Sequence, residues 1–469
     1  MKNRIKQYLL AASMCVGLTA CSDFFEPIPG VQFGLDETFA SKQRTEEYLN
    51  NVYSYVREVT DAIHPNTYGG IFTEASLDGA NRWNKTYAEW TNGSFNSASA
   101  QASEYFSKYY QAIAKASTFI QNVDKCTEAA ASTRGKWKSE ARALRAYYYF
   151  ELLRLYGPIP LIGEDPIPLD ASLEELIKER NSVDECVNFI ATELQSAIDS
   201  GDLLQRAGKA NLGRMDVATC MALKAKLYLY WASPLFNGNT DQASVKNKDG
   251  KQLFPQTEDN SKWAQARDAY ERFMTFATGQ GYKLTEVYTN GKLDPYASCR
   301  AAGEFFTTTW EAVDELIFVK LRDLYDYTYW VCPKFTDFQD TDVTGGGGYY
   351  TTQETVDLFF TKDGLTIEED PGYDKFEGIP SANNFTSGRY YDPNNPSRLY
   401  FDADKSKVLK QWKDREPRFY VNITYSGSIW LNEGKYNEEM RTDFTNGANG
   451  TCGKSKASGD CPDSGYLIR

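Results

Sequence analysis

One segment of the chain, from Ser139 to Tyr156, is apolar around much of its circumference when it is drawn as a helix. A helix of this kind must be covered on most sides, so it requires other helices packed around it. Gly157 and Pro158 follow directly and predict that the helix ends there. We therefore expect a helical assembly built around this segment. Its apolar positions are Ala141, Leu144, Tyr148, Leu152 and Leu155.

Amphipathic helices are predicted on both sides of this segment along the chain. Apolar residues recur at helical spacing in residues 44–59, 104–123 and 263–277, so each stretch has one apolar face. Ser182 and Glu185 form the Ser-x-x-Glu pattern of a capping box, which predicts that a helix begins there. None of these helices can cover its own apolar face.

Another helix is predicted after Asp216, whose side chain can cap the first turn. Its small residues Ala218, Ala222 and Ala225 permit a neighbouring helix to approach closely. Pairs of such helices must stack to bury their apolar faces. We therefore predict a mainly α fold with a scaffold of helical pairs packed as in tetratricopeptide repeats, although no strict repeat period is visible.

Beyond about residue 285 the helical periodicity weakens and turn-forming residues become frequent. Four consecutive glycines, Gly345 to Gly348, and the turn cluster that begins at Asp370 are examples. Leu316 to Lys320 and Phe419 to Tyr425 have the composition of short strands. We predict a loop-rich, partly β region that carries the ligand face and lies over the helical scaffold rather than folding separately.

The first twenty residues have the pattern of a lipoprotein signal peptide. Basic residues precede a short apolar run from Tyr8 to Leu18, and Leu18-Thr19-Ala20 leads into Cys21. We expect cleavage before Cys21 and lipidation of its thiol, and several acyl chains would hold the protein on a membrane. No later stretch is apolar over the length that a bilayer requires. The predicted organisation is a signal peptide in residues 1–20, a helical scaffold in 21–284 and the loop-rich region in 285–469.

The charge balance bears on the partners of the chain. It has 64 acidic and 51 basic residues, and its formal net charge is −13. Proteins that bind nucleic acid need a basic surface, so this class of partner is excluded. Aromatic residues make up 14% of the chain, which suits the binding of ligands with apolar faces.

The sequence has few patterns that indicate catalysis or a bound cofactor. The only histidine, His64, precedes Pro65 in a predicted loop, where a solvent-exposed role is expected. Metal sites built on several histidines are therefore excluded, and no phosphate-binding glycine motif is present. We predict no cofactor, no metal and no enzyme activity. A helical glycoside hydrolase stays open as an alternative, because that chemistry needs only two carboxylates.

Seven cysteines remain after cleavage and lipidation. Cys126, Cys186 and Cys220 fall in helical patterns, where a small buried thiol is expected. Cys452 and Cys461 flank a loop and could form a disulfide in an oxidising compartment, which the sequence leaves open.

Several stretches share a known pattern in the same order along the chain. Residues 139–161 read Ser-Glu-Ala-Arg-Ala-Leu-Arg-Ala-Tyr-Tyr-Tyr-Phe-Glu-Leu-Leu-Arg-Leu-Tyr-Gly-Pro-Ile-Pro-Leu, and Ser182–Glu185 follows. Gly213-Arg214 then leads into Ala222–Tyr230, and Asp363-Gly364 and Arg415-Glu-Pro-Arg-Phe419 come later. Together these stretches resemble the SusD/RagB family, the surface lipoproteins of Bacteroidetes nutrient-uptake systems. Glu416 stands where the family often has Asp.

The resemblance implies a function that composition does not show. It implies a surface-exposed lipoprotein of the outer membrane that captures an oligosaccharide and delivers it to a SusC-like TonB-dependent transporter. Capture of a peptide, as in RagB-type members, is the alternative. The family usually continues past a segment like Gly465–Arg469 into further helices, so a shortened member and a piece of a longer chain are both open.

Candidate ligand-binding residues come from aromatic and polar side chains in predicted loops. Indole rings stack on the C–H face of a sugar, and carboxylates, amides and guanidinium groups bind its hydroxyls. Resemblance to the family implies that the loop after the first long helix contributes to the ligand site. In contrast, three tryptophans lie on helical patterns and are predicted to be core residues: Trp137, Trp231 and Trp263. The candidate ligand-binding residues are Asp78, Arg82, Trp83, Trp90, Asn92 and Trp330.

Overall fold

The computed structural model describes most of the chain, and the statements below concern only those residues. Described are residues 34–57, 76, 79–81, 93–165, 167, 171–303, 314–320, 331–333, 347–376, 378–404, 407–430, 440–441 and 464–468.

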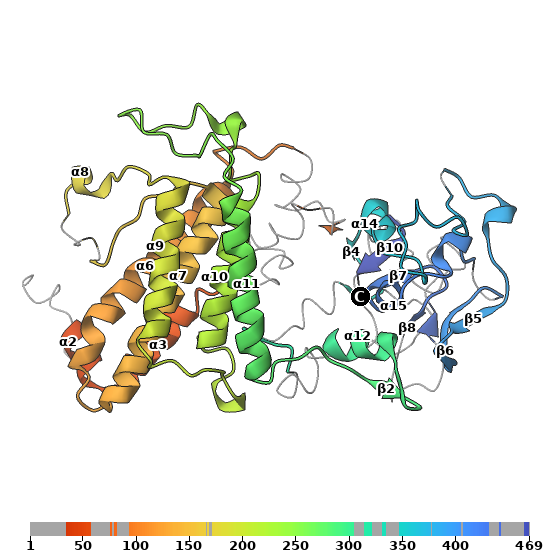
Figure 1. Ribbon diagram of the computed structural model, residues 1–469, viewed down its shortest axis with the longest axis horizontal. Helices are drawn as coiled ribbons and strands as arrows, with labels where there is room; N and C mark the ends of the chain where they lie inside the picture. The colour runs from red at the N-terminus through yellow and green to blue at the C-terminus, as the bar shows by residue number, and fades with distance from the viewer. Residues whose placement is uncertain are drawn as a thin grey trace, which may run out of the picture.

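The helices of the first half form one scaffold in which each long helix packs on the next (Figure 1). This arrangement confirms the predicted mainly α scaffold of stacked helices. The scaffold helices are α2 (Leu35–Ala40), α3 (Lys42–Tyr53), α6 (Ala100–Asn122), α7 (Ala131–Tyr156), α8 (Leu173–Leu176), α9 (Val183–Asp199), α10 (Val217–Ala232) and α11 (Ser261–Gly279).

Helix α7 lies at the centre of the scaffold, as its sequence predicts. Every residue from Ala143 to Leu153 is buried, between α6 on one side and α9 on the other. Gly157 ends the helix with a φ of +68°, a conformation that residues with a Cβ rarely adopt. The burial on all sides explains why this stretch is apolar around most of its circumference.

The predicted helix starts are also confirmed. Ser182 Oγ accepts a hydrogen bond from the Glu185 N–H, and the Glu185 carboxylate accepts one from the Ser182 N–H at 2.7 Å. The Asp216 carboxylate accepts a hydrogen bond from the Thr219 N–H at 2.7 Å. One predicted end is wrong, because α3 stops at Tyr53 although Val56 is still buried in the turn that follows.

Buried ion pairs hold the central helices together. The Arg145 side chain on α7 is fully buried, and its Nε donates to the Glu193 carboxylate on α9 at 2.8 Å. Its Nη1 also donates to Ser117 Oγ on α6 at 3.0 Å. Arg142, one turn earlier, pairs with the other oxygen of Glu193 at 2.9 Å. One guanidinium group thus connects three helices.

Two of the three tryptophans predicted to be core lie against the scaffold, and the third does not. Trp137 is buried, and Trp231 is half-buried with its Nε1 donating to Asp184 Oδ1 at 2.6 Å. Trp263 is 41% exposed, so its prediction as a core residue is wrong. Helix α11 packs on α10 through another face, which carries Ala266 and Phe273 and leaves Trp263 outside.

The predicted buried thiols are confirmed, since Cys126, Cys186 and Cys220 are all buried and free. Burial raises the pKa of the Cys186 thiol to about 11. Cys21, Cys452, Cys461 and His64 lie outside the described residues. Within the described part of the chain, no helix is both long and apolar enough to cross a membrane.

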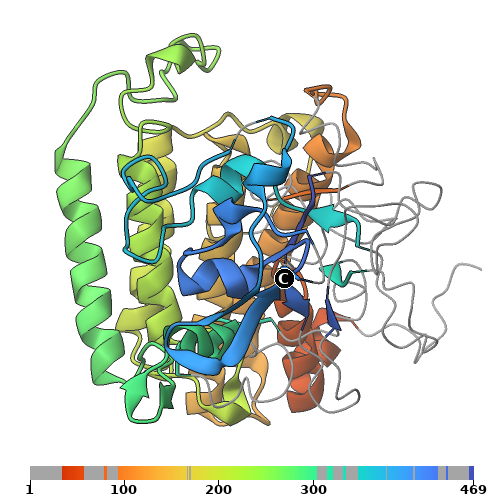
Figure 2. The same ribbon diagram turned by 90° about the vertical axis from the view of Figure 1, so that its right-hand side faces the viewer.

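The second half has a hydrophobic core of its own, made mostly of aromatic residues. The rings of Tyr400 and Tyr420 stack with their centroids 3.9 Å apart, and Phe419 and Tyr425 pack beside them. This region therefore has a core distinct from that of the scaffold, and the predicted division at residue 285 stays a prediction. Its helices are α12 (Pro295–Gly303), α14 (Gln353–Asp357) and α15 (Pro417–Asn422). Figure 2 shows this part in front of the scaffold helices.

Short strands complete the second half. A four-stranded antiparallel sheet has the order β1 (Ala80–Asn81), β4 (Tyr349–Tyr350), β10 (Tyr466–Ile468) and β7 (Ile423–Tyr425). The other strands form three pairs: β2 (Tyr288–Thr289) with β3 (Lys292–Leu293), β5 (Arg389–Asp392) with β6 (Asn395–Asp402), and β8 (Ile429–Trp430) with β9 (Met440–Arg441).

The two strand-like stretches of the sequence have mixed outcomes. Residues 316–320 contain no strand, and their backbone instead bonds to side chains of the scaffold. Residues 419–425 divide into the end of α15 and strand β7. Both stretches are apolar because they pack against aromatic or helical surfaces, and apolar composition alone does not distinguish that from a strand.

Candidate functional site

The six candidate ligand-binding residues lie outside the described residues, so their own contacts stay a prediction. The structure does describe the residues that border their two segments. The first segment lies between Arg57 and Gly93, with described residues at Ser76 and at 79–81, and the second lies between Lys320 and Val331. The residues outside the description are Asp78, Arg82, Trp83, Trp90, Asn92 and Trp330.

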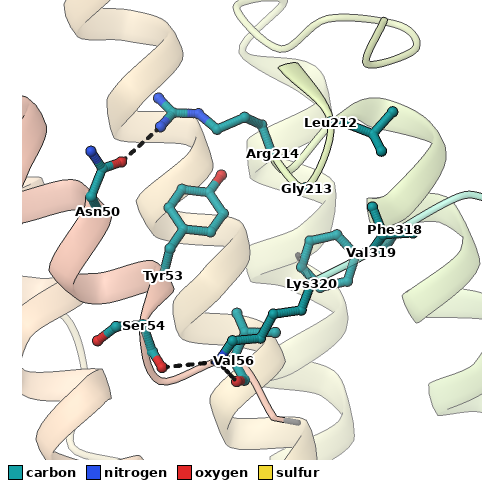
Figure 3. A pocket seen from close by; sticks show the side chains of 10 residues that line it. All are labelled: Asn50, Tyr53, Ser54, Val56, Leu212, Gly213, Arg214, Phe318, Val319 and Lys320. Atoms are coloured by element: carbon teal, nitrogen blue, oxygen red, sulfur yellow. Dashed lines mark hydrogen bonds between the residues drawn. The ribbon is translucent and has the colours of Figure 1, made fainter. Parts of the chain in front are cut away.

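Lys320 joins the start of the second segment to the start of the first. Its Nζ donates hydrogen bonds to the backbone oxygens of Ser54, at 3.2 Å, and Val56, at 2.6 Å (Figure 3). These carbonyls follow the last turn of α3, where the helix leaves carbonyl groups without partners and where a positive charge is favourable. Lys320 therefore joins the described starts of both segments at the end of α3.

The stretch that leads to Lys320 is held along its length by the scaffold. The Arg206 guanidinium pairs with Asp314 at 2.8 Å and lowers the pKa of that carboxyl. Thr219 Oγ1 donates to the backbone oxygen of Ile317 at 3.3 Å. Gly213 has a φ of +81°, and a Cβ there would lie 2.9 Å from the backbone oxygen of Val319. The stretch thus lies directly on the turn before α10.

A small cleft of about 280 Å³ opens beside this junction, between the end of α3, the Gly213 turn and Lys320 (Figure 3). Its polar side chains are engaged with each other. Arg214 pairs with Glu140 through Nε at 3.0 Å and donates to Asn50 Oδ1 at 3.1 Å, and the Tyr53 hydroxyl donates to Glu140 at 3.0 Å. Burial raises the pKa of Glu140. We interpret the cleft as a structural junction.

A second junction joins the middle of the first segment to the far border of the second. Asn81, which precedes Arg82 and Trp83, pairs with Tyr349 in the sheet. The Gly347 N–H donates to the backbone oxygen of Cys332 at 2.9 Å, two residues after Trp330. Residues 347–349 therefore contact both the strand that precedes Arg82 and the residues that follow Trp330. We call this place the β4 corner.

The two junctions bring the borders of both candidate segments together. The predicted site requires that the later segment come close to the earlier one. Described residues of both segments come together at Lys320 and at the β4 corner, and the placement of the six candidate side chains stays a prediction.

Sequence reasoning did not identify Lys320, Gly213 or strand β4 as part of the site. Lys320 binds backbone oxygens, which leave no mark in the sequence of α3. The only available signal was Gly213, because a glycine next to a helix start often marks a positive φ or a close approach. Among the described residues, no group of three His, Cys, Asp or Glu side chains could hold a metal ion.

Two family models match the chain. One, SusD-like_3, described as starch-binding and associating with the outer membrane, matches residues 32–229. The other, described as the SusD family, matches residues 315–469. A curated SusD-like protein from Bacteroides ovatus is 27% identical over 175 residues, which are 36% of this chain. The matched stretch spans 30% of that relative.

Solved structures share the fold. The protein BT4246 has a TM-score of 0.69 at 23% identity, with 91% of this chain and 72% of that one covered. A SusD-like protein from Bacteroides fragilis has a TM-score of 0.64 at 20% identity, over 93% and 70% of the two chains. A SusD-like carbohydrate-binding protein from the same species has a TM-score of 0.59 at 16% identity, over 92% and 68%.

Proposed function

Because the chain belongs to the SusD family, we propose that it captures an extracellular oligosaccharide at the outer membrane. It then passes the oligosaccharide to a SusC-like TonB-dependent transporter. Family membership implies the association with the outer membrane. Lipidation at Cys21, exposure on the cell surface and the transporter partner are part of the proposal.

One observation carries the proposal. The two segments with the candidate residues share a junction at Lys320, where both begin, and another at the β4 corner, where residues 80–81 and the far border of the second segment meet. Loops fixed in this way to a rigid scaffold are the usual place for binding residues. Trp83, Trp90 and Trp330 would supply rings for the C–H faces of sugars, and Asp78, Arg82 and Asn92 would bind hydroxyls.

The choice of an oligosaccharide over a peptide has two supports. The description of the family model that matches residues 32–229 names starch. The candidate residues are rich in indole rings, which stack on sugars in a way that does not depend on a charged group. A peptide ligand is the competing outcome of the experiment below.

The experiment compares Trp83→Ala and Trp330→Ala with the wild type by calorimetric titration. The ligands are maltooligosaccharides, a panel of other plant and host oligosaccharides, and tryptic peptides. Loss of one stacked ring costs about 1–3 kcal/mol, so each variant should bind the preferred oligosaccharide roughly five- to 150-fold more weakly. The melting temperature should stay as in the wild type.

Trp263→Ala is the matched control, because Trp263 is an exposed tryptophan on α11, outside the two candidate segments. It should leave binding unchanged. A lower melting temperature with unchanged affinity in the Trp83 and Trp330 variants would mean that these rings only hold the loops. Binding of peptides but of no oligosaccharide would assign the RagB-type function, and release of shortened sugars would assign a hydrolase.

A further inference from the structure

A second and larger cleft lies in the second half of the chain, apart from the Lys320 junction. Its volume is about 620 Å³, which is within the range of about 300–1,000 Å³ that is usual for small-molecule sites. Its walls come from α14, residues 375–376, 378 and 380, the short helix Lys410–Trp412, and the start of β10. Figure 1 shows α14 and β10 beside each other.

Gln411 lines this cleft with a side-chain amide that has no protein partner. The residue is only 6% exposed, and its backbone oxygen accepts a hydrogen bond from the Tyr373 hydroxyl at 2.9 Å. None of the hydrogen bonds within the described part of the chain involves the Gln411 side-chain amide. Because Gln411 lines the cleft, the donor and the acceptor of this amide are available to a polar group bound there.

A chain of hydrogen bonds fixes the polar wall of the cleft. The Trp412 indole N–H donates to the Tyr466 hydroxyl at 3.0 Å, and that hydroxyl donates to Gln353 Oε1 at 2.7 Å. Gln353 Nε2 then donates to Asp357 Oδ1 at 2.7 Å. Burial raises the pKa of Tyr466 to about 12, so the phenol stays protonated and keeps this direction of donation.

Asp357 ends this chain of hydrogen bonds with one oxygen to spare. Its Oδ2 accepts none of the hydrogen bonds found among the described residues, and the carboxylate borders the cleft. The cleft therefore offers an oriented carboxylate oxygen together with the donor and acceptor of the Gln411 amide. Neighbouring hydroxyls of a sugar are matched by such a set, because each hydroxyl can both donate and accept.

The cleft also has an apolar part. Phe376, Pro380 and Leu409 line it, and the Phe376 ring is half-buried and packs on no other aromatic ring within the described residues. An aromatic ring of this kind can take the C–H face of a sugar. One polar side and one apolar side are what a pyranose ring presents to a protein.

We propose that this cleft is a second saccharide subsite, with Asp357 and Gln411 binding hydroxyls and Phe376 stacking on the sugar ring. The inference rests on the proposed capture of an oligosaccharide. Strand β10 connects the cleft to the β4 corner, because Tyr466 lines the cleft and Leu467 pairs with Tyr350. Tyr466 and Leu467 are consecutive in β10, so we expect one long oligosaccharide to reach both places.

The experiment measures how affinity depends on ligand length, with maltotriose and maltooctaose as probes. Wild type should bind maltooctaose about tenfold more tightly than maltotriose, as expected for one further stacked sugar. Phe376→Ala and Asp357→Asn should remove most of that gain and leave the affinity for maltotriose unchanged. Phe360→Ala is the matched control, because Phe360 is a partly exposed ring that does not line the cleft.

Gln411→Leu separates a binding role from a structural role. Leucine has a similar size and removes an amide that has no protein partner, so the melting temperature should stay the same or rise while the affinity for maltooctaose falls. A fall in melting temperature with unchanged affinity would contradict the proposal.

Two further outcomes separate this subsite from the proposed function. If Trp330→Ala abolishes binding while the cleft variants bind maltooctaose like the wild type, the cleft is not a subsite and the proposed function stands. If the wild type binds neither maltotriose nor maltooctaose, the starch-type function and this subsite both fail.

Discussion

Replacing Arg145 by methionine should be among the most damaging single changes in the scaffold. Its side chain is fully buried and donates hydrogen bonds to Glu193 on α9 and Ser117 on α6. Methionine is similar in length and fills the same space, so the loss of packing should be small. The main effect is that the buried Glu193 carboxylate loses one of its two cationic partners.

The loss of unfolding free energy depends on the ion pair that Glu193 still makes. Removing one member of a buried ion pair costs about 3–5 kcal/mol, because the other charge is left uncompensated. Arg142 still pairs with the second oxygen of Glu193, so we expect the lower end, about 3 kcal/mol. Arg142→Met is the matched control. The Arg142 side chain is 23% exposed, so its loss should cost about 1 kcal/mol or less.

The assay is guanidinium-induced unfolding of the chain from Ser22 onward, followed by far-ultraviolet circular dichroism. Arg145→Met should move the midpoint to lower guanidinium with an unchanged slope, which marks a change in stability alone. The double variant Arg145→Met, Glu193→Gln should be less destabilised than the sum of the two single variants, because it leaves neither charge unpaired. Additive effects, or a loss below about 1 kcal/mol for Arg145→Met, would refute the reasoning.

Three other predictions test separate parts of the molecule. Cys21→Ala should release the protein from membranes, and membrane fractionation like that of the wild type would rule out the lipid anchor. Gly213→Ala should displace residues 314–320, because its Cβ would lie 2.9 Å from the Val319 oxygen at a positive φ; limited proteolysis should then cut near Lys320 faster than in the wild type. The Arg398 guanidinium beside Asp294 lowers the pKa of that carboxyl to about 2. The ionised Asp294 carboxylate therefore stabilises the fold above about pH 4, and this stabilisation is lost as the pH falls toward 2. Asp294→Asn should therefore flatten the acid dependence of stability, by about 2 kcal/mol at most, and an unchanged acid titration would contradict this.

The helical scaffold could be predicted from the sequence because its signals are local. Helix α7 is buried from Ala143 to Leu153 and is apolar around much of its circumference, and the caps at Ser182 and Asp216 are short patterns with a known geometry. Trp263 shows the limit of this reasoning. Its helical spacing is correct, but whether that face is covered depends on which other helix lies beside α11.

The second half could not be predicted in the same way. Its strands are two to eight residues long and its sheet draws β1, β4, β10 and β7 from distant parts of the chain. Strands this short give no alternation that a sequence reveals. Its core is held by stacked aromatic rings such as Tyr400 and Tyr420, whose partners are equally distant.

The candidate site likewise has a part that the sequence predicts and a part that only the fold shows. The sequence identifies residue types suited to sugars, such as Trp83 and Trp330. It gives no sign of Lys320 or of the β4 corner, because a lysine bound to backbone oxygens and a two-residue strand pairing depend on the fold alone.

The strand order of the sheet affects the order in which the parts of the chain fold. Ala80 pairs with Tyr350, which pairs with Leu467, so the sheet closes only when residues from almost the whole length of the chain meet. Pairings this distant in sequence fold slowly, whereas contacts between neighbouring helices form early. A chain that enters a new compartment from its amino terminus would thus build the scaffold first. The four-stranded sheet would be complete only after β10 had joined it.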